Sequence, residues 1–371
     1  MSDTLQATSS LGHDPYPYYR QMREQHPVFY DQDQQEWQVF RYADVERVFT
    51  DYQTFSSRTP CCPFTTDFHS FYRMDPPELQ QYRSLVSKPF TPLAIEQLAD
   101  HISSITAELL DRVADRGQMD IIEDLAFPLP LRVMADLLGL PSQDYDRCAP
   151  WSQGITGEAM PELRAYFLEV LTQRRHRLGS GIISSLLDAR IDGRPLTEEE
   201  LLGFYGQLVA GANAEITPFL GNVVQCLIEH PGVADELRAA PDLIEVAIEE
   251  MLRYYPPVPT TGPRRATVDV EVSGQLIREG QRVRPMIASA NRDDTVFANP
   301  DRFDIRRKPN PHLSFVAGPH FCPGAHLSRL ETRIVLTALL ERFEDIQLAP
   351  GGRLSPAGMQ GIKYLPIVFR S

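Results

Sequence analysis

Cysteine is scarce in this sequence, with five residues among 371. Cys61 and Cys62 are adjacent, but neither has a nearby histidine or further cysteine at the spacing of a metal site. We therefore interpret them as ordinary thiols in a loop, with a metal site as the disfavoured alternative. Five cysteines in a chain of this length argue against a disulfide framework and are typical of a reducing cytoplasm.

Long apolar runs are also missing. The chain has no stretch of about 18 consecutive apolar residues, which argues against a membrane-spanning helix. The first fifteen residues, MSDTLQATSSLGHDP, lack the basic start and the apolar core of a secretory signal. We therefore expect a cytoplasmic protein without a membrane partner.

Basic residues are outnumbered, with 36 Lys and Arg against 50 Asp and Glu, and the formal net charge is -14. This balance disfavours nucleic acids and anionic membranes as partners, although a local basic patch for an acidic protein is compatible with it. The sequence contains no internal repeat, low-complexity tract or linker-like run. The length would allow two domains, but we expect a single domain over residues 1–371.

Helical periodicity dominates the chain. Apolar residues recur at three-four spacing in the segments predicted to be helical, which are residues 42–49, 93–113, 163–171, 201–209, 220–228, 242–253 and 325–343. Runs rich in β-branched and aromatic residues predict a hairpin from residues 28–30 and 37–41, and extended segments at 268–272, 281–287 and 365–369. The fold class is therefore mainly α, with a β-rich part at roughly residues 14–57 and 257–290.

An irregular segment at residues 58–74 is rich in aromatic side chains, namely Phe64, Phe68, Phe71 and Tyr72. Such side chains serve equally well in a loop that covers the core and in a lid over an apolar pocket. Both interpretations stay open at this point.

The strongest chemical signal is the run FVAGPHFCPG at residues 315–324. A single cysteine, Cys322, follows Gly318 by four residues and precedes Gly324 by two, and a long predicted helix begins just beyond. A thiolate that binds iron must be held rigidly by a tight loop, in which glycines allow close approach of the backbone. The positive end of the next helix would also stabilise the negative sulfur. An idle buried cysteine is the alternative, but the whole pattern favours an iron ligand.

A second signal is Glu250 and Arg253, one turn apart near the end of a predicted helix. Such a pair alone is usually a solvated surface pair. Here apolar neighbours and Pro256–Pro257 favour a partly buried pair that a third group completes, and Arg302 is a candidate for this group.

These two motifs, in this order and about 70 residues apart, resemble the cytochrome P450 family, in particular its soluble bacterial members. The resemblance covers nearly the whole chain. Further segments that look like those of the family are DPYPYY at 14–19, WQVFRYADV at 37–45, MDPPE at 74–78, FTP at 90–92, NRD at 291–293 and FANPDRF at 297–303.

The resemblance implies a largely α-helical fold that holds heme b, iron protoporphyrin IX, between the long central helix and the helix after Cys322. It implies Cys322 as the axial ligand, and His320, Arg264 and Arg83 as the residues that hold the propionates. It also places Phe315, Gly318, Gly324 and Ala210 against the cofactor, and identifies Glu250, Arg253 and Arg302 as a structural triad. The register at Arg264 depends on the following Ala266, because Arg265 is adjacent.

Two departures from the family pattern concern the chemistry. The residue four before Arg83 is usually a histidine and here is Leu79. The central helix usually carries an acid followed by a threonine, which relay protons to oxygen. One alignment puts Asn213 and Ala214 at these positions, whereas the alignment we favour keeps Glu215 as the acid and puts Ile216 at the alcohol. Glu215, Thr217 and Asn213 are the candidates for proton delivery, acting through water.

Loss of the usual acid–threonine pair favours an atypical reaction on a substrate with polar N–H or O–H groups. We expect oxidative coupling or cyclisation, or a hydroxylation that the substrate assists, on a small organic or peptide-like secondary metabolite. Ordinary hydroxylation is the main alternative, while oxidation by peroxide and a non-catalytic heme- or carrier-binding module rank lower. The resemblance also implies oxygen as the oxidant and electrons from a ferredoxin and its reductase, docked near Arg83, Lys88, Arg329 and Arg333.

Substrate contact is expected mainly from positions that the resemblance identifies. A short connection at residues 151–161, where relatives have a longer lid, suggests a wide mouth for a large or carrier-tethered substrate, or a merely trimmed loop. The pocket candidates are Phe64, Phe68, Phe71, Tyr72, Gln207, Ala210, Gly211, Ala214, Val258, Thr260, Met359 and Gln360.

Overall fold

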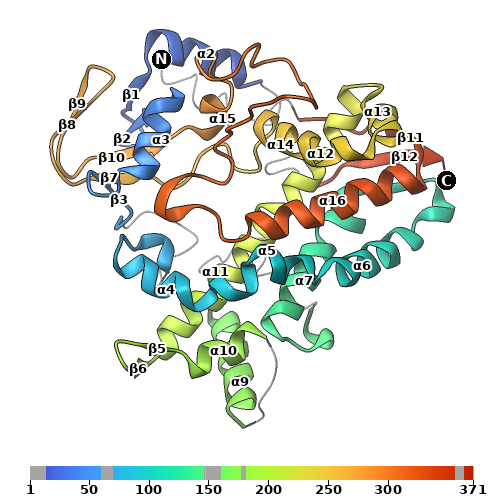
Figure 1. Ribbon diagram of the computed structural model, residues 1–371, viewed down its shortest axis with the longest axis horizontal. Helices are drawn as coiled ribbons and strands as arrows, with labels where there is room; N and C mark the ends of the chain where they lie inside the picture. Colours follow the sequence, from blue (N-terminus) through green and yellow to red (C-terminus); the bar gives the residue numbers. More distant parts are fainter. Residues whose placement is uncertain are drawn as a thin grey trace.

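The computed structural model describes residues 14–59, 70–145, 147, 160–176, 181–355 and 363–370. Helices dominate these residues (Figure 1). In chain order they are α2 (Tyr16–Gln25), α3 (Tyr42–Thr50), α4 (Glu78–Ser87), α5 (Pro92–Glu96), α6 (Ala99–Asp111), α7 (Pro128–Leu138), α9 (Met160–His176), α10 (Ile182–Asp188), α11 (Glu198–Ala214), α12 (Ile216–Glu229), α13 (Val233–Ala239), α14 (Ile244–Tyr254), α15 (Ile287–Ala290) and α16 (Ala325–Arg342). Short helical turns connect several of them, namely η1 (Phe71–Arg73), η2 (Lys88–Phe90), η3 (Ala114–Arg116), η4 (Ile122–Ala126), η5 (Ser142–Asp144), η6 (Pro241–Leu243) and η7 (Gly318–His320).

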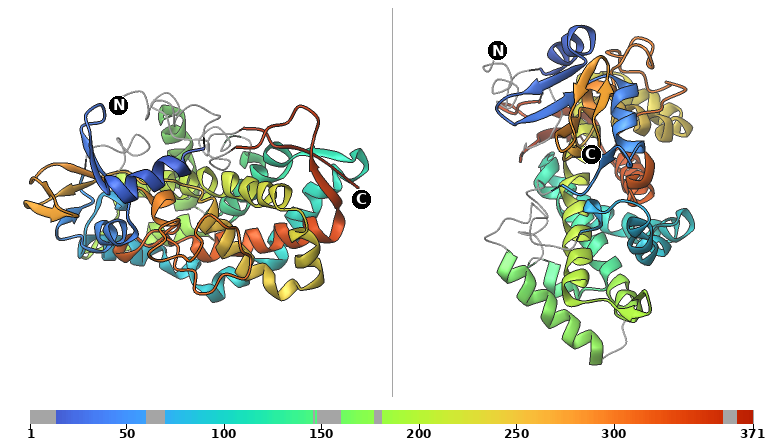
Figure 2. Two further views of the ribbon diagram at one scale, coloured as in Figure 1. Left: turned by 90° about the horizontal axis from the view of Figure 1, so that it is seen from above. Right: turned by 90° about the vertical axis from the view of Figure 1, so that its left-hand side faces the viewer.

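The strands are short and form a minor part of the fold. They are β1 (Val28–Asp31), β2 (Glu36–Val39), β3 (Phe55–Ser56), β4 (Gln118–Asp120), β5 (Arg190–Ile191), β6 (Arg194–Pro195), β7 (Arg264–Ala266), β8 (Val270–Val272), β9 (Gln275–Ile277), β10 (Arg282–Pro285), β11 (Glu344–Leu348) and β12 (Pro366–Arg370). A five-stranded sheet has the order β1-β2-β10-β7-β3, in which only the β2–β10 pair is parallel. The sheet β11-β12-β4 lies at the opposite end of the molecule (Figure 2).

Most predicted elements are confirmed, with different boundaries. The hairpin forms with Val28 opposite Val39, and the helix after Cys322 spans α16. The helix predicted at 93–113 is instead two helices, α5 and α6, because the chain turns at Leu98 so that both can pack against α16. The extended segment predicted to reach residue 287 ends at Pro285, where α15 follows almost at once.

Helices α11 and α12 run end to end through the middle of the molecule (Figures 1 and 2). A capping box at Thr197 and Glu200 starts α11, and most of its length is buried. The helical run is interrupted at Glu215, which has φ -110° and ψ -39° and separates the two helices. This interruption changes the direction of the side chains beyond it, and it lies beside the cavity described next.

Candidate active site

A cavity lies between the α11–α12 run and the loop that leads into α16. Eight of the predicted cofactor, substrate and catalytic residues line it together, namely Phe71, Tyr72, Gln207, Gly211, Glu215, Phe315, Cys322 and Gly324. They come from three separate parts of the chain. The structure therefore brings the thiol, the acid and an apolar wall to one place.

The remaining predicted residues lie elsewhere. Ala210, Ala214, Val258 and Thr260 are not among the described residues that line this cavity; Ala214 is exposed, and the Thr260 hydroxyl donates to the carbonyl of Pro285 at 2.8 Å. Phe64, Phe68, Met359, Gln360 and most of the short connection at 151–161 lie outside the described residues.

The loop that carries Cys322 is held from several sides. The Cys322 backbone N–H donates to the Phe315 carbonyl at 3.0 Å, and the Arg83 guanidinium donates to the carbonyls of Pro319 and Phe321, both at 2.6 Å. Gly318 has φ +68°, and a Cβ on it would lie 2.8 Å from the Phe49 carbonyl oxygen. Only glycine suits that position, because it combines a left-handed backbone with a close approach.

The surroundings of the Cys322 thiol disfavour its negatively charged form. Burial, together with the charge of Glu215 across the cavity, raises the pKa of Cys322 to about 12. The Gly324 N–H, Arg83 and Arg329 act in the opposite direction but do not compensate. A thiolate is the form that binds a metal, so an iron ion at this sulfur would supply the missing stabilisation.

Cationic and polar groups gather beside the same loop. The His320 Nε2 lies 2.8 Å from the Ser57 hydroxyl and 3.0 Å from the Met74 carbonyl oxygen. Burial and the nearby charges of Arg264 and Arg83 lower the pKa of His320 to about 3, so this imidazole is neutral. The guanidiniums of Arg83 and Arg264 thus lie near one edge of the Cys322 loop and suit the carboxylates of a heme, whereas the single N–H of the neutral His320 is taken by the Met74 carbonyl.

Of the three candidates for proton delivery, Glu215 alone lines the cavity. Burial raises the pKa of its carboxyl to about 7, so it exchanges a proton near neutral pH. Asn213 and Thr217 instead contact each other, because the Thr217 hydroxyl lies 2.5 Å from Asn213 Oδ1 and 3.1 Å from the Ala126 carbonyl in η4. The side of the α11–α12 run that carries Asn213 and Thr217 therefore faces η4.

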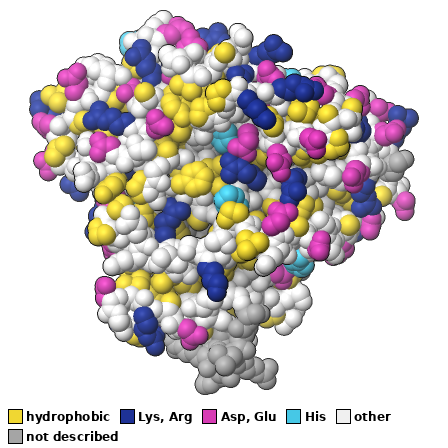
Figure 3. Space-filling model, in the orientation of Figure 1, with side chains coloured by type: hydrophobic (Ala, Val, Ile, Leu, Met, Phe, Trp, Pro, Cys, Tyr) yellow, Lys and Arg dark blue, Asp and Glu magenta, His cyan; other side chains and the backbone are white. Residues whose placement is uncertain are grey.

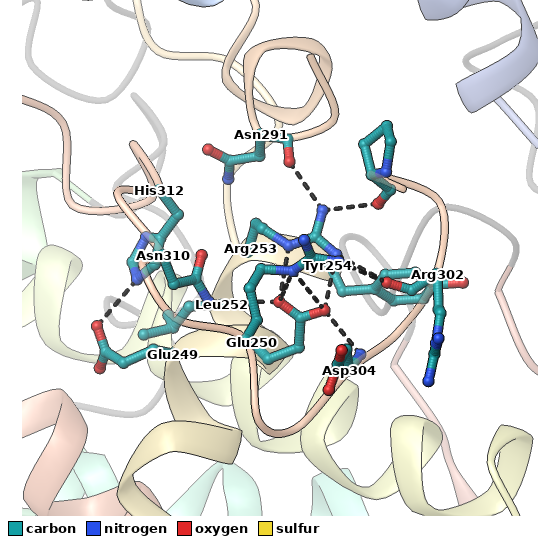
Figure 4. Close-up of polar contacts among 12 residues, drawn as sticks. Glu249, Glu250, Leu252, Arg253, Tyr254, Asn291, Arg302, Asp304, Asn310 and His312 are labelled. Atoms are coloured by element: carbon teal, nitrogen blue, oxygen red, sulfur yellow. Dashed lines mark hydrogen bonds and ion pairs between the residues drawn. The ribbon is translucent and has the colours of Figure 1, made fainter. Parts of the chain in front are cut away.

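Behind the cavity, Glu250 and Arg253 on α14 form a wholly buried ion pair (Figure 4). Arg253 also donates to the carbonyls of Asn291, Pro300 and Arg302. The prediction that the Arg302 side chain completes this group was wrong, since Arg302 is exposed and its side chain points away. The turn at this point directs the Arg302 carbonyl inward, and the Arg307 guanidinium binds Glu250 at 3.0 Å instead.

Several residues that line the cavity were not predicted from the sequence, and Glu331 is the most notable of them. It lies on α16, is 1% exposed, and its Oε1 has no hydrogen-bond partner in the described part of the chain. Burial raises the pKa of its carboxyl to about 8. The signal was present in the helical spacing, because Glu331 follows Gly324, Leu327 and Ser328 along one face of α16.

Within the described ranges, no group of three or more His, Cys, Asp or Glu side chains is arranged to hold a metal ion. None of the helices in those ranges combines the length and apolar composition that a membrane crossing requires.

Comparison with known proteins agrees with this geometry. The model of the family described as Cytochrome P450 matches residues 242–357. The chain is 37% identical over 369 residues to the putative cytochrome P450 YjiB of Bacillus subtilis, covering 94% of this chain and 92% of that protein. It is 36% identical over 383 residues to the cyclomarin C epoxidase CymV of Salinispora arenicola, covering 97% of each. Among solved structures, CYP109E1 from Bacillus megaterium in complex with testosterone superposes with a TM-score of 0.89 at 35% identity, covering 96% of this chain and 97% of that one.

Proposed function

The chain belongs to the cytochrome P450 family and is a heme-iron monooxygenase of that family, and on this premise we propose that it oxidises a small organic or peptide-like secondary metabolite. It would use oxygen and electrons from a ferredoxin. The observation that carries the proposal is the buried Cys322 thiol, which faces the carboxyl of Glu215 across one cavity. A metabolite substrate is supported by the relative named as a cyclomarin C epoxidase.

The described residues suit heme b, and their proposed roles follow from their positions. Cys322 would bind the iron, Arg83 and Arg264 would receive the propionates, and Phe315 and Gly324 would adjoin the ring. The family resemblance alone supports the corresponding roles for His320, Gly318 and Ala210. When bound, the heme supplies the iron at which oxygen is activated. The Phe315 carbonyl fixes the backbone of Cys322 by accepting from its N–H, the Gly324 N–H stabilises negative charge on the sulfur, and the buried setting excludes water from it.

Proton delivery is assigned to Glu215, with Thr217 and Asn213 acting only through water. A carboxyl with a pKa of about 7 can hold a proton in the resting enzyme and release it at neutral pH. The described α11 and α12 residues that line the cavity include no serine or threonine. This supports oxidative coupling, cyclisation or substrate-assisted hydroxylation over ordinary hydroxylation. Product mass distinguishes them, since coupling removes two hydrogens and hydroxylation adds one oxygen.

The electron donor is proposed to dock on a groove between α5, α14 and α16, which we call the proximal groove. It is lined by Arg307, Lys308, His326, Arg329 and Arg333 and by the acids Glu96, Glu245 and Glu249. Basic and acidic side chains are interleaved on this face (Figure 3). Arg329 lies 2.6 Å from Glu249, and Arg333 lies 2.9 Å from Glu96. An acidic ferredoxin would therefore compete with these exposed carboxylates for the guanidiniums.

This docking proposal is tested by charge reversal. Arg333→Glu should slow reduction by ferredoxin severalfold at low salt, and less at high salt because ions screen the contact. Lys88→Glu should act in the same direction. Arg278→Glu, outside the groove, is the matched control. Unchanged reduction by Arg333→Glu at low salt would exclude this surface.

The substrate class is tested by titrating the ferric protein with aromatic amino acids, cyclic dipeptides, short peptides, polyketides and fatty acids. A saturable shift of the heme spin state with one class supports a free small-molecule substrate. A shift only with a carrier-tethered member supports a carrier partner. We also propose a cytoplasmic location and a single folding unit over the whole chain, and a single unfolding transition would support the latter.

The central assignment is tested with two cysteine variants. Cys322→Ser should abolish the thiolate-type absorbance of the reduced carbon monoxide complex. Cys226→Ser is the matched control, since Cys226 is also buried but does not line the cavity. A thiolate-type complex that persists in Cys322→Ser would refute the assignment.

A further inference from the structure

The amide of Gln207 is an unsatisfied hydrogen-bond donor at the cavity. Gln207 lies on α11, is 5% exposed and lines the cavity. Its Nε2 makes no hydrogen bond of normal geometry with any described residue, although the Tyr72 phenol is close by. A buried donor without an acceptor destabilises the folded protein, so such an atom calls for an explanation.

The orientation of this amide is set by Ser70, which is 3% exposed. The Ser70 hydroxyl donates to Gln207 Oε1 at 2.8 Å and accepts from the backbone N–H of Tyr72 at 3.2 Å. If the amide were reversed, the Ser70 proton would lose this acceptor. The arrangement therefore directs the two N–H bonds of Gln207 away from Ser70 and leaves them for another acceptor.

The surroundings of the amide are largely apolar. The Phe71 ring packs 5.6 Å from that of Phe204, and Leu208 and Met134 also line this cavity. One turn along α11, a Cβ on Gly211 would lie 3.7 Å from the Tyr72 hydroxyl. An oriented donor among apolar side chains favours ligands that place a matching acceptor against it.

We propose that Gln207 donates a hydrogen bond to a carbonyl oxygen of the substrate, and that the substrate is a largely apolar molecule that carries this carbonyl. The inference rests on the proposed function, because it takes the cavity as the substrate site of a heme enzyme. Ser70 is a positioning residue in this account, since it acts through the amide of Gln207.

The test uses ligands that are anchored at the heme, so the natural substrate need not be known. Phenylimidazoles bind the iron through nitrogen, and the phenyl ring carries either an acetyl group or an isopropyl group of the same shape, at the meta or para position. Heme absorbance titrations give the affinity of each pair for the holoenzyme. In the wild type, we expect the acetyl member of at least one pair to bind about tenfold more tightly.

Two variants isolate the donor. Gln207→Met and Gln207→Leu both remove the amide N–H groups while leaving an apolar side chain in their place. Each should lose the tenfold preference while keeping its thiolate-type carbon monoxide complex. Ser70→Ala should reduce the preference without abolishing it. Gln347→Glu, an exposed change on β11, should behave like the wild type.

Three results would overturn the inference. The first is that no pair of ligands shows a preference in the wild type. The second is that the preference survives in both Gln207 variants. The third is that an amino-substituted ligand binds more tightly than the acetyl ligand, which would mean that the amide presents its oxygen to the cavity. A wild-type protein that forms no thiolate-type complex would overturn the proposed function and this inference with it. A normal complex without the preference overturns the inference alone.

Discussion

Two parts of the molecule bury carboxyl groups in opposite ways. Glu250 is completely buried, and its two oxygens receive hydrogen bonds from Arg253, Arg307, Asn310 and the Asp304 backbone N–H. Glu331 is equally buried, yet its Oε1 has no partner in the described chain. A buried carboxylate whose hydrogen bonds are all made fixes the path of the backbone around it. A buried carboxyl oxygen without a partner lowers the stability of the folded protein, and a structural role does not explain why it is retained.

The difference extends to the proton affinities of the cavity acids. Burial raises the pKa of Glu215 to about 7 and that of Glu331 to about 8, and neither shift has a compensating charge among its causes. Perturbed carboxyls that share a cavity are typical of functional sites. We therefore assign the Glu250 cluster to the folding of the chain and propose that the cavity acids take part in its chemistry.

The largest expected effect comes from breaking the satisfied cluster. Arg253→Met would leave Glu250 buried without its main partner, which should lower the free energy of unfolding by about 3–5 kcal/mol. Urea denaturation measures this loss. Arg278→Met is the control, because its ion pair with Asp269 is exposed and should contribute less than about 1 kcal/mol. Equal losses of unfolding free energy in Arg253→Met and Arg278→Met would contradict the contrast between the buried and the exposed ion pair.

The next effect concerns catalysis. Glu215→Gln should slow product formation about 100-fold, because a neutral amide cannot deliver a proton. In the wild type, the rate should fall as the pH rises through about 7, where Glu215 loses its proton, and this step should be absent in the variant. Glu46→Gln removes an exposed carboxyl on α3 and should leave both rate and pH profile unchanged. If Glu215→Gln keeps the fall in rate near pH 7, that fall is caused by another titrating group.

A smaller effect is expected on stability. The pKa of Glu331 is higher in the folded protein than its ordinary value of 4.5, so the folded state binds more protons between about pH 4.5 and 8. Its stability should therefore decrease as the pH rises through that window. Glu331→Gln removes this contribution, so its advantage in stability over the wild type should be small at pH 5 and should grow as the pH rises to 8. Denaturation at the two pH values would show whether the difference changes.

The two regions also differed in how well the sequence predicted them. The helices, the hairpin, Cys322 and the Glu250–Arg253 pair followed from periodicity and from motifs that lie close together in the chain. The identity of the third cation did not, because a turn at residues 299–302 decides which arginine faces inward, and Arg307 rather than Arg302 does so. Local pattern cannot distinguish two arginines that are five residues apart in an irregular loop.

The cavity was predicted less completely. Glu215 and Gln207 were identified as candidates, but the hydrogen bonding of Gln207 depends on a contact across the chain with Ser70. Glu331 was missed because a glutamate on a long helix normally faces water. Its spacing places it on the same face of α16 as Gly324 and Leu327, and the packing of α16 against the α11–α12 side buries that face. Residue propensity and apolar periodicity predict where helices and strands lie in the sequence. Whether a single polar atom is buried depends on how those elements pack against one another.

The most direct test of this account is an infrared titration of the cavity acids, which needs no substrate. Difference spectra of the holoenzyme between pH 6 and pH 9 report protonated carboxyl groups through their C=O stretch. The account predicts a signal in the wild type that is lost in two steps, near pH 7 and pH 8, with the first step absent in Glu215→Gln and the second absent in Glu331→Gln. A wild-type protein with no protonated carboxyl at pH 6 would contradict it.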